Sequence, residues 1–470
     1  MKGSARRTTI LAATAVAAVA AAAVAAAGST ATSVAAAPRH ATTASATTGF
    51  QPATRGAPPR RSAGHPNATS PSLRAAPSSV VFGCQSAAAS VRCYGPDQMR
   101  HAYGVDDLVD AGYTGAGRTI VIVDAFQSPT IRQDLADFDT VWGLPDANLR
   151  IVAPQGQVRY DPNDANQVGW AGEISLDVEW AHAIAPGADL VLALARTNND
   201  IDIQDTLAYV ANHRLGDVVS QSFGEAEACY GVNADGTRQP GARLSVEHAI
   251  YQRAVARGMT LVASAGDSGS TEPTCDGKGA MIAASTPASD PLVTGVGGTQ
   301  LFADPVTGAY DHEVVWNEEA RFGYRTSGGG GFSSVYGVPG FQQSLGSLPS
   351  RGVPDVSYDA AIDGGVVVAF SAGVYPRGTF FIFGGTSSGA PQWSGIVADV
   401  AQLNGRSLGD INPALYSIAR STPGAFHDIM VGQNGDYGLG GFTAGTGWDA
   451  ASGLGSPVAG TLGPALAALR

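Results

Sequence analysis

A serine in a glycine-rich segment is the first candidate for chemistry. Ser387 lies in GGTSSGAPQW, residues 384–393. Residues 379–385 before it are apolar like a β-strand, and residues 390–405 after it have the pattern of a helix. A hydroxyl at such a strand-to-helix turn is accessible, and the helix N-terminus favours negative charge that develops beside it. Ser387 is therefore predicted to be a nucleophile, although a serine that only caps a helix before Pro391 would show the same pattern.

One hypothesis for the base of this serine comes from its immediate neighbours. Residues 385–389 match G-x-S-x-G, a pattern typical of α/β-hydrolases, in which an acid and then a histidine follow the serine. Asp410 and His427 come in that order and could complete such a triad with Ser387. An esterase is therefore one hypothesis.

A second hypothesis replaces the histidine with carboxyl groups. Glu173 and Asp177 are four residues apart in GEISLDVEWAHAIAPG, so on a helix they would share one face. Two like charges at this spacing destabilise a helix slightly, so the presence of both residues indicates a role other than helix stability. An acidic helix face exposed to solvent would show the same spacing. A third carboxyl group, Asp267, ends the apolar run MTLVASAGD.

These residues need a scaffold that brings distant segments together. Continuous apolar runs typical of strands buried on both faces alternate with segments of helical periodicity. The predicted strands are 118–126, 187–195, 217–224, 259–267 and 291–298, and the predicted helices are 170–184, 201–213 and 244–257. The alternation predicts an α/β fold, a parallel sheet with helices on both faces. Ligands of such folds bind at the carboxyl ends of the strands.

Composition and charge exclude some classes of protein. The chain has 470 residues, of which 44% are hydrophobic and 14% charged, so most of it can bury a core. Asp and Glu number 40 against 28 Lys and Arg, which gives a net charge of -12. This balance argues against nucleic acid as the main partner and suits an acidic medium.

The N-terminal residues differ in composition from the rest of the chain. Residues 1–27 combine basic residues, an apolar run and small residues, and we expect them to be a secretory signal peptide. Residues 28–78 are rich in Ala, Thr, Ser and Pro, and are predicted to be a disordered linker or short pro-segment. Residues 79–470 form one large predicted domain without another long apolar run, so we expect a secreted, extracellular protein with no membrane anchor in its mature form.

Four cysteines fit an exported protein. Four cysteines allow three pairings, among which sequence cannot choose. Short loops favour Cys84–Cys93 and Cys229–Cys275.

Eight motifs in series resemble those of the sedolisins, the serine-carboxyl peptidase relatives of subtilisin. The resemblance covers residues from about 93 to the C-terminus. In chain order the motifs are CYGPDQMRHAYGVDDL, GRTIVIVDAF, LDVEWAHAIAPGA, SAGDSG, SGGGGFS, RGVPDVSYDA, GGTSSGAP and GWDAASGLGSP. The resemblance implies a subtilisin-like parallel sheet flanked by helices in a single catalytic domain.

The resemblance also implies a role for each candidate residue. Ser387 would be the nucleophile, Glu173 its base, and Asp177 the group that holds Glu173. Asp267 would occupy the oxyanion hole. Asp124, in IVIVDAF, lies near the place of the subtilisin acid and is interpreted as structural or as a residue that supports the catalytic groups without touching substrate.

Two further segments resemble the subtilase strands that bind substrate. One pairs with the substrate backbone and the other lines the pocket for the residue before the cleaved bond. The first segment contributes Ser222, Phe223 and Gly224, and the second contributes Ser264, Ala265 and Gly266. Residues 326–333, TSGGGGFS, are expected to form a flexible wall of the same cleft.

The C-terminal segments FHDIM and TAGTGWDAASGLGSP resemble the calcium loop of the family. Calcium takes about six to eight oxygen ligands, including carboxylates and backbone carbonyls. The resemblance implies one structural calcium ion, although a plain glycine-rich turn would have the same spacing. Its ligands would be Asp428, Ile429, Gly445, Gly447 and Asp449.

Together these features predict a secreted, acid-active endopeptidase that forms an acyl-enzyme on Ser387. A glutamate base works best near its own pKa of about 4.3, and a carboxyl group in an oxyanion hole donates a hydrogen bond only when it is protonated. We expect a monomer that acts on proteins and peptides. The chain departs from the family because many sedolisins have a long folded propeptide, whereas only about 50 residues separate the predicted signal from the domain here.

Overall fold

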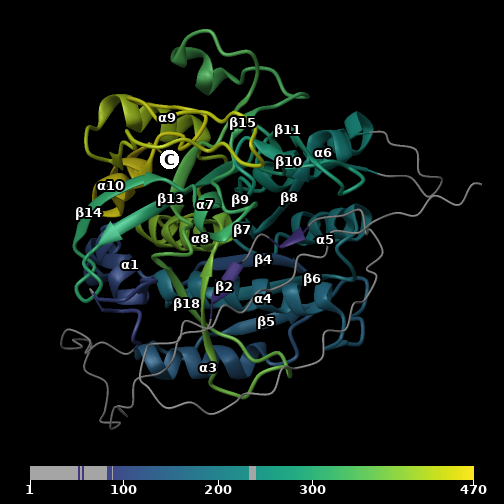
Figure 1. Cartoon of the computed structure of the whole chain (residues 1–470), viewed down its shortest axis with the longest axis vertical. Helices are drawn as coiled ribbons and strands as arrows, with labels where there is room; N and C mark the ends of the chain where they lie inside the picture. Colours follow the sequence, from purple (N-terminus) through teal and green to yellow (C-terminus); the bar gives the residue numbers. More distant parts are fainter. Residues whose placement is uncertain (1–50, 53–54, 58–81, 87, 232–239, 470) are drawn as a thin grey trace, which may run out of the picture.

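The computed structural model describes residues 51–52, 55–57, 82–86, 88–231 and 240–469. Its centre is an eight-stranded sheet in the order β14-β13-β9-β7-β4-β6-β5, with β17 also paired to β13 (Figure 1). All of its pairings are parallel except that of β13 with β14. The strands are β4 (Thr119–Ala125), β5 (Leu149–Val152), β6 (Asp189–Ala195), β7 (Val218–Gln221), β9 (Thr260–Ser264), β13 (Thr294–Ala303), β14 (Tyr310–Val315) and β17 (Val356–Asp359).

Successive side chains of each strand enter two different cores. In β4, Ile120 and Ile122 belong to one hydrophobic cluster, and Val121 and Val123 belong to the other. The first cluster includes residues of α3 (Ile131–Trp142), α4 (Ala165–Ile184) and α8 (Thr386–Leu403). The second includes residues of α5 (Asp200–His213) and α6 (Pro240–Ala256). The predicted α/β architecture, with helices on both faces of the sheet, is confirmed.

Smaller sheets surround the central one, and their pairings are antiparallel except that of β18 with β3. β8 (Phe223–Ala226) pairs with β1 (Gln51–Pro52) and β12 (Ser285–Thr286). A four-stranded sheet has the order β2-β19-β18-β3, formed by β2 (Arg55–Ala57), β19 (Phe380–Gly384), β18 (Gly365–Ala369) and β3 (Cys93–Tyr94). The strand predicted over 379–385 therefore exists, but in this second sheet.

The other elements lie at the periphery or connect the layers. They are α1 (Pro96–Ala102), α2 (Asp106–Asp110), η1 (Glu227–Cys229), β10 (Thr271–Pro273), β11 (Ala280–Ile282), α7 (Glu319–Phe322), β15 (Gly331–Phe332), η2 (Gly340–Leu345), β16 (Gly352–Val353), α9 (Asn412–Ser421), β20 (Phe426–His427), β21 (Ser456–Pro457) and α10 (Ala459–Ala468). In the described part of the chain, no helix combines the length and apolar character that crossing a membrane requires.

The N-terminal region differs from the sequence prediction where it is described. The predicted signal peptide, residues 1–27, lies outside the described residues. The range 28–78, predicted to lack structure, contains the two short strands β1 and β2. Pairing with the edge of a folded sheet uses backbone groups, so it leaves no apolar periodicity for sequence reasoning to detect.

Both predicted disulfides are present. Cys84 is bonded to Cys93, with Cα atoms 5.2 Å apart, and Cys229 is bonded to Cys275, with Cα atoms 5.0 Å apart.

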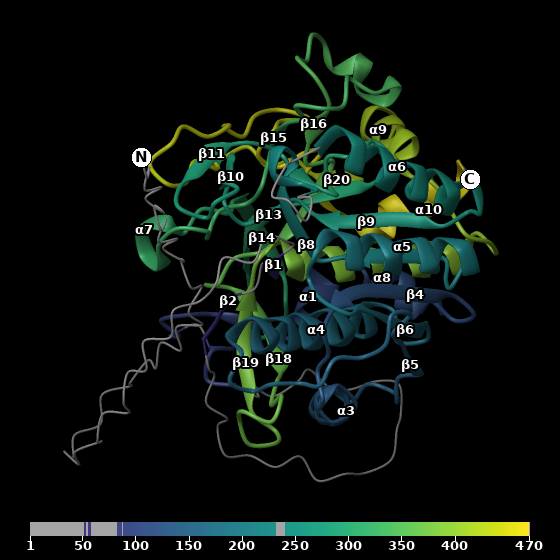
Figure 2. The ribbon, with the colours of Figure 1, turned by 90° about the vertical axis from the view of Figure 1, so that its right-hand side faces the viewer.

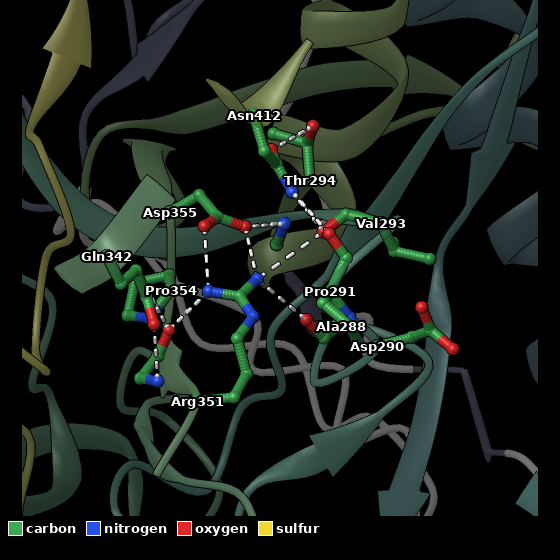
Figure 3. A network of polar contacts seen from close by, with 12 residues as sticks. Ala288, Asp290, Pro291, Val293, Thr294, Gln342, Arg351, Pro354, Asp355 and Asn412 are labelled. Atoms are coloured by element: carbon green, nitrogen blue, oxygen red, sulfur yellow. Dashed lines mark hydrogen bonds and ion pairs between the residues drawn. The ribbon is translucent and has the colours of Figure 1, made fainter. Parts of the chain in front are cut away.

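A buried ion pair ties the sheet to the segment that enters β17 (Figure 3). Arg351 and Asp355 are both fully buried, and their two side chains form two bonds, of 2.5 and 2.8 Å. Arg351 also donates to the carbonyls of Ala288 and Val293 at 3.4 Å, and Tyr416 of α9 donates to Asp355 at 2.9 Å. Because its partners come from two other segments, residues 288–293 and α9, the pair fixes the positions of these segments relative to β17.

We predict that Arg351→Met destabilises the protein by about 3–5 kcal/mol, because it leaves the Asp355 charge buried without its cation. The control is Arg377→Met, which breaks the exposed pair of Arg377 with Asp137 and should cost less than about 1 kcal/mol. Urea unfolding of both variants measures the difference. Equal losses of stability would contradict the structural role of the buried pair.

Candidate active site

Ser387 is the second residue of α8 and is fully buried, whereas the sequence predicted an accessible hydroxyl at this turn. Gly385, before the helix, has φ 118°, a conformation that favours glycine. The predicted helix began at residue 390, but α8 begins at Thr386, and Pro391 lies inside it. Since Pro391 has no N–H group, it cannot donate the usual helical bond to the Ser387 carbonyl. The strand-to-helix junction therefore presents Ser387 in the first turn of the helix.

Asp267 caps this helix from another part of the fold. It follows β9, and its Oδ1 accepts hydrogen bonds from the Thr386 backbone N–H at 2.8 Å and the Thr386 hydroxyl at 2.9 Å. The Thr386 hydroxyl also contacts the backbone of Gly266 at 3.1 Å. Asp267 is thus bonded to the residue next to Ser387, which places these two predicted site residues together. The cap explains why α8 starts four residues before the predicted helix.

Helix α4 brings Glu173 to the same end of α8. A Cβ built on Gly172 would lie 3.6 Å from the Phe383 ring, and one built on Gly395 would lie 2.6 Å from Ile184. The second contact is twelve residues farther along both segments, so α4 and α8 pack side by side and run in the same direction. Glu173 therefore lies level with the β19–α8 junction.

Buried carboxyl groups gather around this junction. Burial raises the pKa of Asp177 well above its usual value, and the neighbouring charges of Asp124 and Glu173 raise it further, while the Ser222 hydroxyl opposes the shift. Burial raises the pKa of Asp124, at the end of β4, to about 8. Glu173, Asp177 and Asp124 are all fully buried. The predicted base, its predicted partner and Asp124 thus form one electrostatic cluster.

The predicted substrate-binding residues lie next to each other, at the ends of two neighbouring strands. β7 and β9 are neighbours in the sheet, with Gln221 opposite Ala263. The segments that follow these strands contain all six predicted binding residues. Ser222, Phe223 and Gly224 lie after β7, and Ser264, Ala265 and Gly266 end β9 and continue from it. Both segments lie at the carboxyl edge of the sheet, where ligands of parallel sheets bind.

The glycine-rich loop 326–333 does not form the flexible wall that we expected. Residues 326–331 are buried. Gly329 donates a hydrogen bond to the Gly266 carbonyl at 2.7 Å, and a Cβ built on Gly329 would lie 2.0 Å from the Ala265 carbonyl oxygen. The glycines therefore allow the backbone to pack directly against the predicted pocket strand.

Two further acidic residues next to the pocket segments were missed by sequence reasoning. Burial raises the pKa of Glu272 to about 7, and its Oε1 would lie 2.8 Å from a Cβ built on Gly266. Burial, followed by the charge of Asp200, raises the pKa of Glu225 in β8 well above its usual value. Neither residue lies in a recognisable motif, so only the fold reveals their position.

The structure does not assemble the alternative triad of Ser387, Asp410 and His427. Gly409, next to Asp410, bonds to the backbone of Gly258 at the start of β9, whereas Asp267 and Ser387 lie beyond the end of that strand. His427 lies in β20 and stacks on Tyr310 with ring centroids 3.8 Å apart. The acid of this triad is therefore at the opposite edge of the sheet from the serine.

The predicted calcium ligands lie around one turn. Asp428 accepts from the Gly447 N–H at 3.1 and 3.0 Å, and Asp449 accepts from the Gly445 N–H at 2.9 Å. Ile429 is buried beside them. No cluster of three or more His, Cys, Asp or Glu side chains suited to a metal occurs among the described residues. The two carboxylates that face one turn fit a site in which backbone carbonyls supply the other ligands.

Comparisons with known proteins match this geometry. The model of the subtilase family matches residues 157–415. Sedolisin of Pseudomonas sp. (strain 101) is 33% identical over 79% of this chain and 60% of its own length. Kumamolisin of Bacillus sp. (strain MN-32) is 32% identical over 80% of this chain and 64% of its own length. The chain thus spans less than two thirds of these curated relatives.

A solved structure agrees with these sequence matches. Pseudomonas sedolisin (serine-carboxyl proteinase), complexed with two molecules of pseudo-iodotyrostatin, superposes with a TM-score of 0.68 and 30% identity, covering 80% of this chain and 98% of that chain. The family model and this match over almost the whole of a sedolisin domain lead to one conclusion: the chain belongs to the sedolisin family of subtilases.

Proposed function

We propose that the protein is a secreted, acid-active serine-carboxyl endopeptidase that hydrolyses peptide bonds. The observation that carries this proposal is the pair of hydrogen bonds that Thr386 donates to the Asp267 carboxyl group. These bonds fix an acidic side chain beside Ser387, the proposed nucleophile. Membership of the sedolisin family supports the same activity. Substrates are proteins and peptides, and the enzyme acts as a monomer.

In the first step, the Ser387 oxygen attacks the carbonyl carbon of the peptide bond, and Glu173 accepts the hydroxyl proton. Glu173 then gives the proton to the leaving amine, and a water molecule hydrolyses the acyl-enzyme with Glu173 again as base. Asp177, four residues along α4, orients Glu173. Since both side chains are fully buried, their positions are fixed by the surrounding core.

Asp267 stabilises the negative oxygen of the intermediate. Because its Oδ1 accepts two hydrogen bonds from Thr386, a proton carried on Oδ2 can be donated to the oxyanion. Such a donor is worth about 3–4 kcal/mol of barrier. An ionised Asp267 would repel the oxyanion instead, so both the glutamate base and the aspartate donor favour a pH optimum of about 3–5.

Substitutions of the serine and the base separate this mechanism from the esterase hypothesis. Ser387→Ala should lower kcat for casein or gelatin at pH 3–5 by at least about 10⁴-fold, and Glu173→Gln by about 10²–10⁴-fold, since each removes a group that acts in every turnover. His427→Ala should leave activity within about twofold, because His427 lies outside the proposed site.

Glu179→Gln is the matched control for Glu173→Gln. Glu179 lies on the same helix and is equally buried, and a glutamine there can still accept the Ala369 N–H bond. Activity that survives Glu173→Gln, or is lost with His427→Ala, would contradict the mechanism. Activity undiminished at pH 8 would contradict the roles of the carboxyl groups.

We also propose one structural calcium ion at the C-terminal turn. Its ligands are the carboxylates of Asp428 and Asp449 and the carbonyls of Ile429, Gly445 and Gly447. The ion would hold together the segments before β21 that carry these ligands. The convergence of the two carboxylates on residues 445–447 supports the site.

Calcium removal should lower stability. A ligand present at 100 times its Kd stabilises the folded state by about 2.7 kcal/mol, so chelation should lower the Tm by several degrees and added calcium should restore it. Asp428→Asn should remove this calcium response, whereas Asp311→Asn, at an exposed position, should retain it. Thermal unfolding of the Ser387→Ala protein avoids self-digestion, and a Tm insensitive to chelator would disprove the calcium site.

A further inference from the structure

Two tyrosine rings stack on each other at the surface of the molecule. The ring centroids of Tyr324 and Tyr437 are 4.5 Å apart, and the ring planes are 9° from parallel. Tyr324 is 55% exposed, and exposed tyrosine is typical of binding surfaces because its ring offers a large, rigid contact. Tyr324 follows α7, which lies at the left of Figure 2, on the same side of the view as β10 and β11. One face of the Tyr324 ring is therefore covered by Tyr437, and the other is open to a ligand.

The backbone that carries the two rings is strained. Arg325, next to Tyr324, has φ 65°, and Tyr437 has φ 55°. This left-handed region favours glycine and is costly for other residues, and strain of this kind clusters at functional sites. One buried carboxylate holds both conformations, because Asp436 accepts from the Arg325 N–H at 2.8 Å and from the Tyr437 N–H at 2.7 Å. The fold thus fixes the position of the ring pair in advance.

The ring pair lies within reach of a peptide bound at the proposed active site. Ser327, three residues after Tyr324, donates its backbone N–H to the Asp267 carbonyl at 3.1 Å. Asp267 is bonded in turn to the residue before Ser387. Three residues of chain span at most about 11 Å, and an extended peptide advances about 3.3 Å per residue. A residue a few positions from the cleaved bond can therefore contact the Tyr324 ring.

The ring pair lies on the opposite side of β9 from β7. The predicted substrate-binding segments follow β7 and β9 and are expected to hold the residues before the cleaved bond. The chain on both sides of Tyr324 is bonded instead to β13, the other neighbour of β9. The Trp316 N–H donates to the Gly298 carbonyl at 3.0 Å, and the Gly328 N–H donates to the Trp316 carbonyl at 2.9 Å. The ring pair is therefore placed to contact residues after the cleaved bond.

The surroundings of the rings favour an aromatic or apolar ligand. Leu439, in the same turn as Tyr437, is 39% exposed, and its N–H donates to the Asp436 carbonyl at 2.9 Å. Its side chain adds apolar surface to this turn. A basic side chain can also stack on a tyrosine ring, but the cation of Arg325, next to Tyr324, would repel it. Aromatic rings have no such conflict, since they gain from stacking and from burial of their apolar surface.

We propose that the Tyr324–Tyr437 pair binds an aromatic or large apolar side chain located after the cleaved bond of the substrate. The proposal rests on the proposed function and adds a substrate preference to it. The free face of Tyr324 makes the contact, and Tyr437 supports the ring from its other face. Because the rings are already in position, little conformational freedom is lost when a substrate binds to them.

Pairs of peptide substrates test the proposal. Each pair has Phe or Ala at one of the four positions on either side of the cleaved bond, and kcat/KM is measured at about pH 4. At one position after the bond, we expect Phe to be preferred by about three- to tenfold, the gain typical of an aromatic pair. Tyr324→Ala should lower this ratio to less than about twofold, whereas Tyr324→Phe, which keeps the ring, should retain it.

The control is Tyr209→Ala, which removes a ring stacked on His213 with centroids 4.0 Å apart. His213 ends α5 and precedes the start of β7, at the opposite edge of the sheet from the proposed cleft. The control should leave the preference unchanged. A ratio that Tyr324→Ala leaves unchanged would overturn the site, even if both rates fall, since a purely structural role affects Phe and Ala peptides alike. A preference lost only before the cleaved bond would overturn the assignment to this side.

Binding to the Ser387→Ala chain separates this proposal from the proposed function. The Kd values of the same Phe and Ala peptides are compared with and without Tyr324→Ala. We expect one Phe peptide to bind about three- to tenfold more tightly than its Ala counterpart, and only when Tyr324 is present. If no form of the chain cleaves peptides at any pH, the proposed function fails, while this difference in Kd still decides whether the rings bind an aromatic side chain. Equal Kd values for every pair would overturn the site.

Discussion

The burial of carboxyl groups at the carboxyl edge of the central sheet is the constraint on which the rest of this structure depends. A carboxyl group removed from water must be paired, hydrogen-bonded or protonated, because an isolated buried charge is costly. Burial raises the pKa of Asp124 to about 8 and that of Glu272 to about 7, and it raises the pKa of Asp177 well above its usual value. Asp124, Asp177 and Glu272 thus keep their protons up to a pH at which exposed carboxyl groups have lost them.

The fold places these groups by combining rigid elements from distant parts of the chain. Helix α4 is buried on every side from Trp170 to Ile184, so its acidic residues have no exposed face to occupy. Asp267 satisfies the first N–H of α8, which couples the start of the serine helix to the end of β9. The same interaction that stabilises the helix end also positions an acid beside the proposed nucleophile, so in the proposed mechanism stability and chemistry depend on one contact.

Sequence alone predicted the parts of this arrangement that leave a local pattern. Apolar runs such as 118–126 identify buried strands, and the spacing of Glu173 and Asp177 identifies one helix face. The start of α8 was missed because its cap, Asp267, is 119 residues away in sequence. The tight packing of Gly329 and the pairing of β1 and β2 depend on contacts between backbones, which no side-chain pattern records. These features were missed because each depends on contacts between residues that are far apart in the sequence.

The pH dependence of stability tests the buried carboxyl groups most directly. Folding raises the pKa of Asp124 and Glu247 to about 8 and of Asp139 and Glu272 to about 7, so from about pH 4 to 8 the folded state holds more protons than the unfolded state. The free energy of unfolding must then fall as pH rises. Burial lowers the pKa of His182 to about 4, so this residue alone has the opposite effect, and only between about pH 4 and pH 6.5. In the Ser387→Ala protein at fixed calcium concentration, the account predicts a Tm that decreases from pH 4 to pH 8, less steeply with Asp124→Asn than with the exposed control Asp311→Asn. A Tm that stays constant or rises over this range would contradict it.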